Sequence, residues 1–271
     1  MSIKPTLPFR LGSTSYVIPD DIVPNARFLA PLVDDIELVL FEVESETNLP
    51  TPDVITELVR LAAEHHLTYT VHLPLDLRLA SPRNSRRDPS LVKAVRVIQT
   101  TLPLCPYAFV VHLDGTEITD RPTPMTTAAW QEQAARSLEV ICQAAGDPSL
   151  IAVENLESYD AAVLFPLLDC LPVSLCADVG HLLKNGNDPI PFLWDHLDRA
   201  RVIHLHGAVN GRDHLGLDQI ARPVLRRLVE VLVQRSYQGV LTLEVFSEGQ
   251  FRSGREMVLA LTESIRESDR T

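Results

Sequence analysis

Short apolar runs rich in β-branched residues recur eight times along the chain, and each is followed by turn residues and a segment of helical period. These candidate strands are Arg10–Val17, Asp35–Glu42, Thr68–Leu75, Tyr107–Asp114, Leu150–Leu156, Val173–Val179, Arg201–Gly207 and Val240–Phe246. The runs are almost continuously apolar, as strands buried on both faces are. Eight such strands alternating with helices in 271 residues predict an α/β fold, a single (β/α)8 TIM barrel over residues 1–271.

Helix signals fill the intervals between these runs. Thr51–Asp53 provides an N-cap, a proline at the first helical position and an acid in the first turn, and Asp88–Pro89 predicts a second helix start of the same kind. Pro166 and Pro223 fall inside two predicted helices, where proline disfavours a continuous helix. Further helices are predicted at Thr127–Ala144, Tyr159–Cys170, Pro191–Leu197, Asp218–Gln234 and Gly254–Glu267.

A doubly wound open sheet is the structural alternative. That fold usually carries a glycine-rich phosphate turn after its first strand. The corresponding segment here, Leu11–Ser15, has no GxGxxG pattern, so the closed barrel is favoured.

The composition excludes several classes of protein. The formal charge of −12, from 36 acidic and 24 basic side chains, argues against a long nucleic acid as partner. Residues 1–10 lack the apolar core of a signal peptide, and no apolar run is long enough to span a membrane. We expect a cytoplasmic protein without a membrane partner; its oligomeric state is open. The cysteines lack CxxC spacing and are expected to be small buried side chains: Cys105, Cys142, Cys170 and Cys176.

Metal-capable side chains fall at the C-terminal ends of successive candidate strands. In a barrel these ends surround one mouth, so residues far apart in sequence converge there. Neutral imidazoles and carboxylates together suit one or two divalent ions, with zinc expected first and Mn, Co or Fe as alternatives. The side chains are His72, His112, Glu154, Asp178, His181, His204, His206 and Glu244.

Each of these residues has a simpler interpretation when taken alone. A single strand-end histidine is more often a hydrogen-bonded core or surface residue, and a single glutamate can face solvent at the rim. An ionised carboxylate inside a barrel is nevertheless costly without a partner, and the pattern recurs on several strands. His204 and His206 share a face, so only one needs to bind, and His206 is nearer the mouth. The predicted ligands are His72, His112, Glu154, Asp178, His206 and Glu244.

The ordered set of Glu154, Asp178-x-x-His181, His206 with Arg212 six residues on, and Glu244 resembles the xylose-isomerase-like barrels (the AP endonuclease 2 superfamily). This superfamily contains sugar isomerases and epimerases as well as endonuclease-IV-type apurinic endonucleases. The epimerase resemblance implies that His181 and Arg212 contact substrate and that one ion is bound by Glu154, Asp178, His206 and Glu244.

The endonuclease branch implies more ions. Matches to His72 and His112 add a second ion bridged by Glu154, and a third ion is held by a match to His181 and an Asp-x-His pair. This chain reads Gly211-Arg-Asp-His214, so it lacks that pair and a third ion is doubtful, although Asp213 and His214 remain candidates for binding it differently. His72 and His112 favour a hydrolytic site, in which we expect Glu154, His181 and Arg212 to be catalytic.

An arginine-rich segment, Asp76–Arg87, follows the third strand. A loop there lies over the mouth of a barrel and can act as a lid, and arginine matches phosphate oxygens bidentately. A solvated loop paired with acidic neighbours is the equal alternative. Lys184 is a further candidate at the same rim. The predicted substrate-binding residues of the loop are Arg78, Arg83, Arg86 and Arg87.

The N-terminal stretch Gly12–Asn25, followed by Val33–Glu42, is similar to the cobamide-remodelling phosphodiesterase family (CbiR) of this superfamily. The resemblance implies a metal-dependent phosphodiesterase that cleaves the nucleotide loop of a cobamide (a corrinoid), releasing an α-riboside and cobinamide phosphate. Glu42 is expected to point toward the mouth as a substrate-binding residue or general base, with a structural salt bridge as the equal alternative.

Three other functions compete with this one. A sugar epimerase would use one metal with Glu154 and Glu244 as opposed carboxylates, and it would tolerate loss of His72 and His112. An apurinic endonuclease needs a basic DNA-binding face, which the charge of −12 disfavours. A binding protein without catalysis is disfavoured by the complete ligand set.

Overall fold

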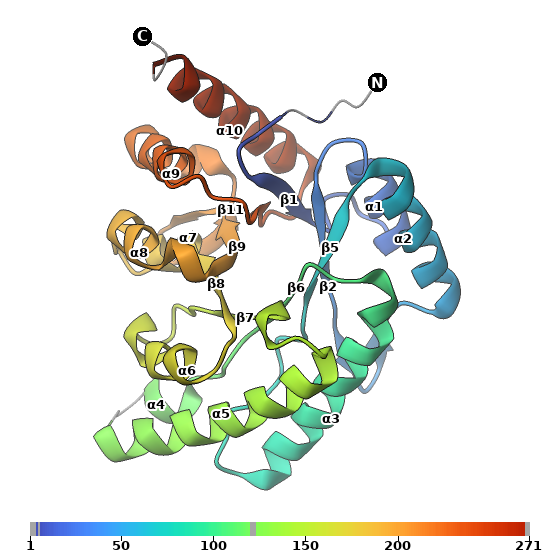
Figure 1. Cartoon of the computed structure of the whole chain (residues 1–271), viewed down its shortest axis with the longest axis vertical. Coiled ribbons are helices and arrows are strands. Elements are labelled where there is room, and N and C mark those ends of the chain that lie inside the picture. The colour runs from blue at the N-terminus through green and yellow to red at the C-terminus, as the bar shows by residue number, and fades with distance from the viewer. Residues whose placement is uncertain (1–3, 5, 120–122, 269–271) are drawn as a thin grey trace.

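The computed structural model describes residues 4, 6–119 and 123–268. Within these residues, parallel strands close into a barrel in the order β1-β12-β9-β8-β7-β6-β5-β2 (Figure 1). This confirms the predicted barrel. Its strands are β1 (Arg10–Thr14), β2 (Asp35–Val39), β5 (Thr68–His72), β6 (Ala108–Val111), β7 (Ile151–Glu154), β8 (Ser174–Asp178), β9 (Ala200–Leu205) and β12 (Val240–Leu243).

Helices surround the barrel (Figure 1). Their buried faces pack with the outward side chains of the strands into one large apolar core, in which Trp130, Tyr69, Phe109 and Phe251 are the largest fully buried side chains. The helices are α1 (Ile22–Leu29), α2 (Pro52–His65), α3 (Asn84–Thr101), α4 (Thr116–Thr119), α5 (Pro124–Ala145), α6 (Phe165–Cys170), α7 (Val179–Lys184), α8 (Pro189–His196), α9 (Arg222–Gln234) and α10 (Glu248–Ser268).

Proline positions correct two of the predicted helix starts. Helix α6 begins at Phe165 rather than Tyr159, and α9 begins at Arg222 rather than Asp218. Pro166 and Pro223 therefore stand in the first turn, where the missing amide hydrogen costs nothing because no acceptor is available there.

Four other helices begin earlier than predicted. Helix α5 begins at Pro124 rather than Thr127, and α8 begins at Pro189 rather than Pro191. Helix α3 begins at Asn84, not at Asp88, so Pro89 lies inside it. Pro89 is the sixth residue of this helix and has no amide hydrogen to donate to the Ser85 carbonyl, so one hydrogen bond of the second turn is missing. Helix α10 begins at Glu248 rather than Gly254, and Gly254 is buried within it.

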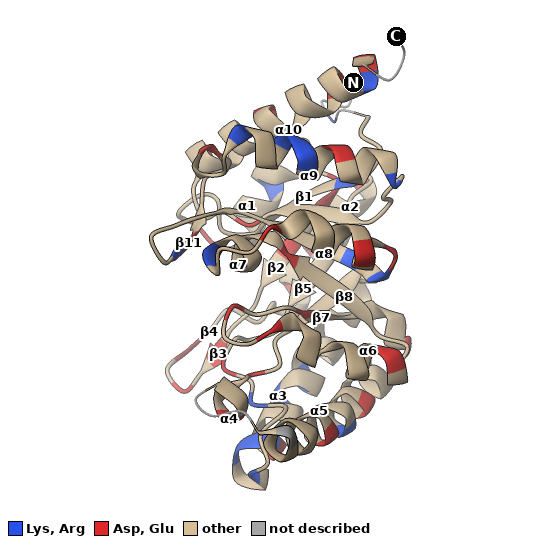
Figure 2. Ribbon diagram, turned by 90° about the vertical axis from the view of Figure 1, so that its left-hand side faces the viewer, with Lys and Arg blue, Asp and Glu red and all other residues tan. Residues whose placement is uncertain are grey.

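Two antiparallel hairpins were not predicted. The strands β3 (Glu42–Val43) and β4 (Glu46–Thr47) follow β2, while β10 (Gly207–Val209) and β11 (Arg212–Leu215) follow β9. Both hairpins extend from C-terminal ends of barrel strands, and Figure 2 shows them on the same side of the molecule. They were missed because strands this short carry little periodic signal.

All four cysteines are free thiols, as expected, but only two of them are buried. Cys142 and Cys176 are buried, whereas Cys105 and Cys170 are exposed, which corrects the expectation for the latter pair. No helix in the described part of the chain is long and apolar enough to cross a bilayer. The assignment of residues 1–271 to one domain stays a prediction, because both termini lie outside the described residues.

Candidate metal centre

Side chains at alternate positions of the barrel strands point into the barrel. The lower inward positions on β6, β7 and β8 form a small buried cluster that contains Val110, Ala152 and Cys176. Two residues further along each strand, the inward position is polar. A polar layer therefore lies on an apolar floor, and it is made of His72, His112, Glu154, Asp178, His204, His206 and Glu244.

Glu154 lies at the centre of this layer and is almost fully buried. One carboxylate oxygen, Oε2, is 2.8 Å from His112 Nε2 and 3.3 Å from His72 Nε2. The other, Oε1, is 3.4 Å from His204 Nδ1 and 3.5 Å from His181 Nδ1. The two oxygens thus face separate groups of imidazoles, as those of a bridging carboxylate would.

A second group of potential ligands adjoins the first and shares Glu154 with it. Glu244 Oε2 is 3.2 Å from His204 Nδ1, and Asp178 Oδ2 is 3.3 Å from His206 Nε2. The ligand atoms of Glu154, Asp178, His204 and Glu244 all lie within 4.8 Å of one another, as do those of His72, His112 and Glu154. Each group could supply the ligands of one ion, and Glu154 belongs to both groups.

Several buried atoms of these residues have no hydrogen-bond partner among the described residues. They include His204 Nδ1, Glu244 Oε2 and His214 Nδ1. Buried polar atoms are normally satisfied, and a divalent ion would satisfy His204 Nδ1 and Glu244 Oε2, which belong to one ligand group. Imidazole nitrogens with carboxylate oxygens are donors that zinc, manganese and iron accept, so the residues fit a metal ion.

Hydrogen bonds outside the cluster fix which ring nitrogen faces it. His204 Nε2–H donates to Glu37 Oε2 at 2.9 Å, and His72 Nδ1–H donates to the Leu73 carbonyl at 2.8 Å. His204 Nδ1 and His72 Nε2 therefore face the carboxylates, and in the neutral rings these are the nitrogens whose lone pairs a metal ion would accept. His206 was predicted as a ligand in preference to His204, but the structure brings both to the centre. Glu37 was not predicted, although an acid inside the apolar run of β2 was a usable signal.

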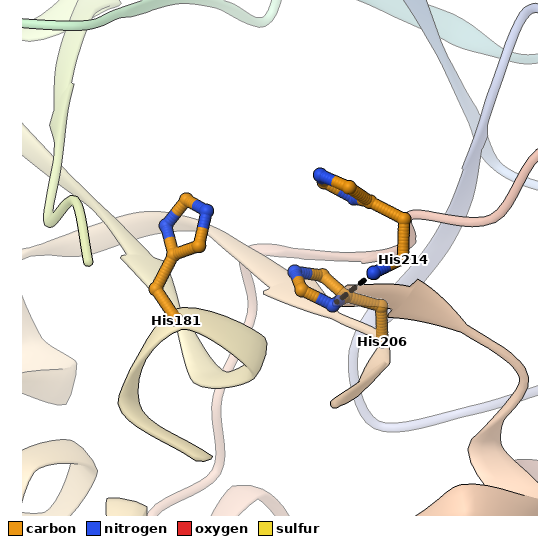
Figure 3. Close-up of side chains that lie close together, drawn as sticks. All are labelled: His181, His206 and His214. Atoms are coloured by element: carbon orange, nitrogen blue, oxygen red, sulfur yellow. Dashed lines mark hydrogen bonds between the residues drawn. The ribbon is translucent and has the colours of Figure 1, made fainter. Parts of the chain in front are cut away.

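Three histidines gather at the edge of the cluster (Figure 3). The backbone N–H of His214 donates to His206 Nδ1 at 3.0 Å, and the rings of these two residues are 4.4 Å apart. The ring of His181 is 5.8 Å from that of His206. Gly180 permits this approach, because a Cβ there would overlap the His206 ring.

A lysine occupies the place next to these histidines where a further ion would bind. Glu157, His181 and Asp213 form a third group of potential ligands. Lys184 Nζ donates to Asp213 Oδ2 at 2.6 Å and to Glu157 Oε1 at 2.9 Å. The single ammonium charge pairs with both carboxylates. Whether a third ion binds stays a prediction.

Comparison with known proteins decides the family. A family model described as the xylose isomerase-like TIM barrel matches residues 33–267. The chain belongs to this family. No curated protein matches it in a sequence comparison.

Solved structures show the same fold at low identity. A D-tagatose 3-epimerase-like protein aligns with a TM-score of 0.79 and 19% identity, over 96% of this chain and 99% of that one. A 3-keto-D-glucoside 4-epimerase from E. coli gives 0.70 and 17%, over 94% and 99%. Endonuclease IV from Thermus thermophilus gives 0.67 and 17%, over 93% and 99%. These relatives include sugar epimerases and a nuclease, and at such identities they establish the fold alone.

The carboxylates of this xylose isomerase-like barrel strongly affect its histidines. Burial alone would lower the pKa of His72, but the hydrogen bond and charge of Glu154 raise it to about 9. Burial likewise lowers the pKa of His206, whereas Asp178 and Glu244 raise it to about 9. Burial would raise the pKa of Glu154, yet the charges of His112 and His204 bring it well below its usual range. Protons therefore compete with metal ions for these imidazoles.

The predicted arginine lid is not a free loop. Leu77, Leu79 and Ala80 are buried, and Arg86 and Arg87 belong to α3. Arg87 donates to the Ser81 carbonyl and to Asn84, and also to Gln133 of α5, which fixes it between α3 and α5.

The remaining arginines of the segment differ in position. Arg83 and Arg86 are exposed. Arg78 Nε is 3.6 Å from Asp114 Oδ2, just beyond the end of β6, so Arg78 is the arginine of this segment that pairs with a residue of the mouth.

Two further predicted residues lie on the unpredicted hairpins. Glu42 on β3 forms an ion pair with Arg96 of α3, and Lys93 donates to its carbonyl at 2.7 Å. It therefore occupies the salt bridge that was its alternative role and does not join the ligand groups. Arg212 on β11 is exposed, two residues from His214.

Proposed function

We propose that this xylose isomerase-like barrel is a metal-dependent phosphodiesterase that hydrolyses the nucleotide loop of cobamides to cobinamide phosphate and an α-riboside. The observation that carries the proposal is the position of Glu154 between two ligand groups, with His72 and His112 on Oε2 and His204 on Oε1. A single-metal proton transfer has no need of the first group. Zinc is the ion that we expect.

Divalent ions in the two groups would act as Lewis acids on the phosphodiester and supply a nucleophile near neutral pH. In the hydrolysis, water oxygen bonds to phosphorus, the bond from phosphorus to the riboside oxygen breaks, and phosphate stays on the cobinamide. His181 lies 3.5 Å from both Glu154 and Glu157 and is the imidazole that we assign to protonate the riboside oxygen. Arg212 and Arg78 are assigned to bind the phosphate oxygens.

The N-terminal stretch supports the choice of a cobamide. Its similarity to the cobamide-remodelling family covers the loop that follows β1 and leads into α1. Asn25 is buried in this stretch and accepts from the backbone amides of Val17 and Ile18 at 2.9 Å, while its amide group donates to the Asp20 carbonyl at 2.8 Å. Asn25 therefore holds in shape a loop at the mouth of the barrel, where a substrate would enter.

Sugar epimerisation is the second candidate. It is favoured by the four-ligand group with its two carboxylates, Glu154 and Glu244, and by the epimerases among the similar structures. An apurinic endonuclease is less well supported. The β3–β4 hairpin carries Glu42, Glu44 and Glu46 at the mouth (Figure 2), which would repel a DNA backbone.

One experiment separates these functions. The purified protein is loaded with Zn, Mn, Co or Fe and incubated with cobalamin, and cobinamide phosphate and α-ribazole are followed by chromatography. In parallel, free ketoses are assayed for epimerisation. Cobalamin turnover supports the proposal, whereas ketose epimerisation without cobalamin turnover contradicts it.

The His72→Ala variant tests the role of the second ligand group. We expect it to abolish hydrolysis, because the ion bound next to Glu154 Oε2 loses a ligand, whereas an epimerase would keep most of its activity. The matched control is His65→Ala on the outer helix α2. Hydrolysis that survives in His72→Ala would contradict the two-group mechanism.

A further inference from the structure

Large apolar side chains are exposed at the mouth of the barrel. Each of them lies three or four residues beyond the end of a barrel strand, namely β2, β5, β9 or β12. Segments that follow the strands of a (β/α)8 barrel surround the face that holds the active site. We call this set the apolar half-rim, and its members are Val43 (51% exposed), Leu75 (59%), Val209 (41%) and Phe246 (45%).

The half-rim occupies one continuous arc of the mouth. In the closed sheet, β9, β12, β1, β2 and β5 are neighbours in that order. Val43 and Val209 lie on the β3–β4 and β10–β11 hairpins, which project on the same side of the molecule (Figure 2). The opposite arc, beyond β6, β7 and β8, instead carries Asp114, Glu157 and Lys184. This opposite arc, the charged arc, has no member of the half-rim, whereas within the half-rim Glu42, Glu44 and Glu46 stand beside Val43 on the same hairpin.

The apolar arc begins at the metal centre itself. The ring of Phe246 is 5.4 Å from the ring of His214, whose Nδ1 is 3.6 Å from Glu244 Oε2. On the other side, Leu75 follows the ligand candidate His72 by three residues. A substrate held at the centre therefore extends over the half-rim or over the charged arc.

We propose that the apolar half-rim binds a large, mainly apolar ring system carried by the substrate, and that it determines which diesters the enzyme accepts. This inference rests on the proposed function, in which the ring system is the corrin and the charged arc faces the riboside. Exposed apolar surface next to a polar site is costly in water and is typical of a ligand-contact surface. A small diester would be too short to contact the half-rim, so these apolar side chains would stay exposed to water.

The test measures binding of cobinamide, which has the corrin but lacks the nucleotide, and so it does not depend on catalysis. Equilibrium dialysis is carried out with the metal-loaded protein and with the Leu75→Ser/Val209→Ser variant. We expect this variant to bind cobinamide about tenfold more weakly, because two apolar contacts are lost. Both side chains are exposed, so unfolding is not expected, and thermal denaturation checks it.

The matched control is Val140→Ser. Val140 is 40% exposed, like Val209, but it lies near the end of α5 at the opposite face of the barrel. This variant is expected to bind cobinamide like the unchanged protein.

The outcomes separate the inference from the proposed function. If cobinamide binds and the half-rim variant weakens it, the inference holds, even if cobalamin is not hydrolysed and the phosphodiesterase proposal fails. If cobinamide does not bind, or binds equally to both proteins, the inference is overturned, even if cobalamin is hydrolysed. A half-rim variant that changes only the oligomeric state also overturns it, since the surface would then bind a second copy of the chain.

Discussion

Glu37 accepts a hydrogen bond from His204 at 2.9 Å inside the barrel, and this bond decides which nitrogen of His204 faces the metal centre. Both side chains are fully buried. With Nε2 donating to Glu37, Nδ1 faces Glu244 at 3.2 Å and Glu154 at 3.4 Å, and in the neutral ring it holds the lone pair for a metal ion. A carboxylate–histidine–metal arrangement of this kind orients the ligand and increases its basicity.

Removal of the Glu37 acceptor is expected to weaken metal binding. In Glu37→Leu the His204 ring loses its orientation, and we expect the affinity for zinc to fall by about 10–100-fold, as measured by competition with a chromogenic chelator. Glu37→Gln retains an acceptor oxygen and should keep most of the affinity. The control is Asp35→Asn, on the same strand but bonded to Thr70 N. Equal affinities in Glu37→Leu and the unchanged protein would show that His204 is not a ligand.

Gly180 is expected to be required for the position of His206. In Gly180→Ala the new methyl group overlaps the imidazole, so the ring must move and Asp178 loses its partner. We expect zinc affinity and turnover to fall roughly 100-fold, because displacement of a ligand by about 1 Å is enough for such a loss. Gly249→Ala is the control, since a Cβ there meets open space. Unchanged metal affinity in Gly180→Ala would exclude His206 from the centre.

Lys184 is expected to prevent binding of a further ion. In Lys184→Ala the carboxylates of Glu157 and Asp213 lose their shared cation, and with His181 they form an open ligand group. We expect the variant to bind one zinc ion per chain more than the unchanged protein, as measured by elemental analysis after dialysis. Lys93→Ala, which removes a lysine paired with Asp76, is the control. An unchanged number of zinc ions per chain would show that Lys184 is not what prevents a further ion from binding.

Asp35 is expected to make the barrel less stable as the pH rises. Burial raises the pKa of this carboxyl to about 6 despite its hydrogen bonds to Thr68 and Thr70, whereas the unfolded value is about 3.9. Between these values the folded state binds more protons, so the free energy of unfolding falls as the pH increases through this window.

For Asp35 this loss amounts to about 2 kcal/mol between pH 4.5 and 7. Asp35→Asn removes the titration, so the variant should lose about 2 kcal/mol less stability than the unchanged protein over that range. Urea denaturation of the metal-free proteins at the two pH values measures the difference. Parallel pH profiles for both proteins would contradict a raised pKa at Asp35.

The sequence was sufficient for the barrel because its strands are buried on both faces and its helices carry clear stop and start signals. It was not sufficient where local signals compete. Pro166 and Pro223 indicate interruption when they are read inside a helix, but they stand at helix starts in the structure. The hairpins that carry Glu42 and Arg212 could not be predicted from the sequence, because strands of two to four residues are too short to show an alternating apolar pattern.

The sequence also predicted only part of the arrangement of the strand-end residues. Their alternation in sequence placed His72, His112, Glu154, Asp178 and Glu244 toward one mouth, since the C-terminal ends of barrel strands meet there. Alternation cannot choose between His204 and His206, which share a face and both reach the centre. It also cannot show that Lys184 lies between two carboxylates, or that Arg87 is fixed between α3 and α5.

The sequence by itself therefore determined the eightfold alternation, the barrel and the polar layer at the strand ends, because these follow from residue period and strand direction. Only the tertiary structure decided which nitrogens and oxygens face one another. Closure of the sheet brings Glu37 of β2 to His204 of β9 across 167 positions. It also gathers the exposed side chains of four separate segments into the apolar half-rim. Such contacts depend on through-space distances that no local pattern encodes.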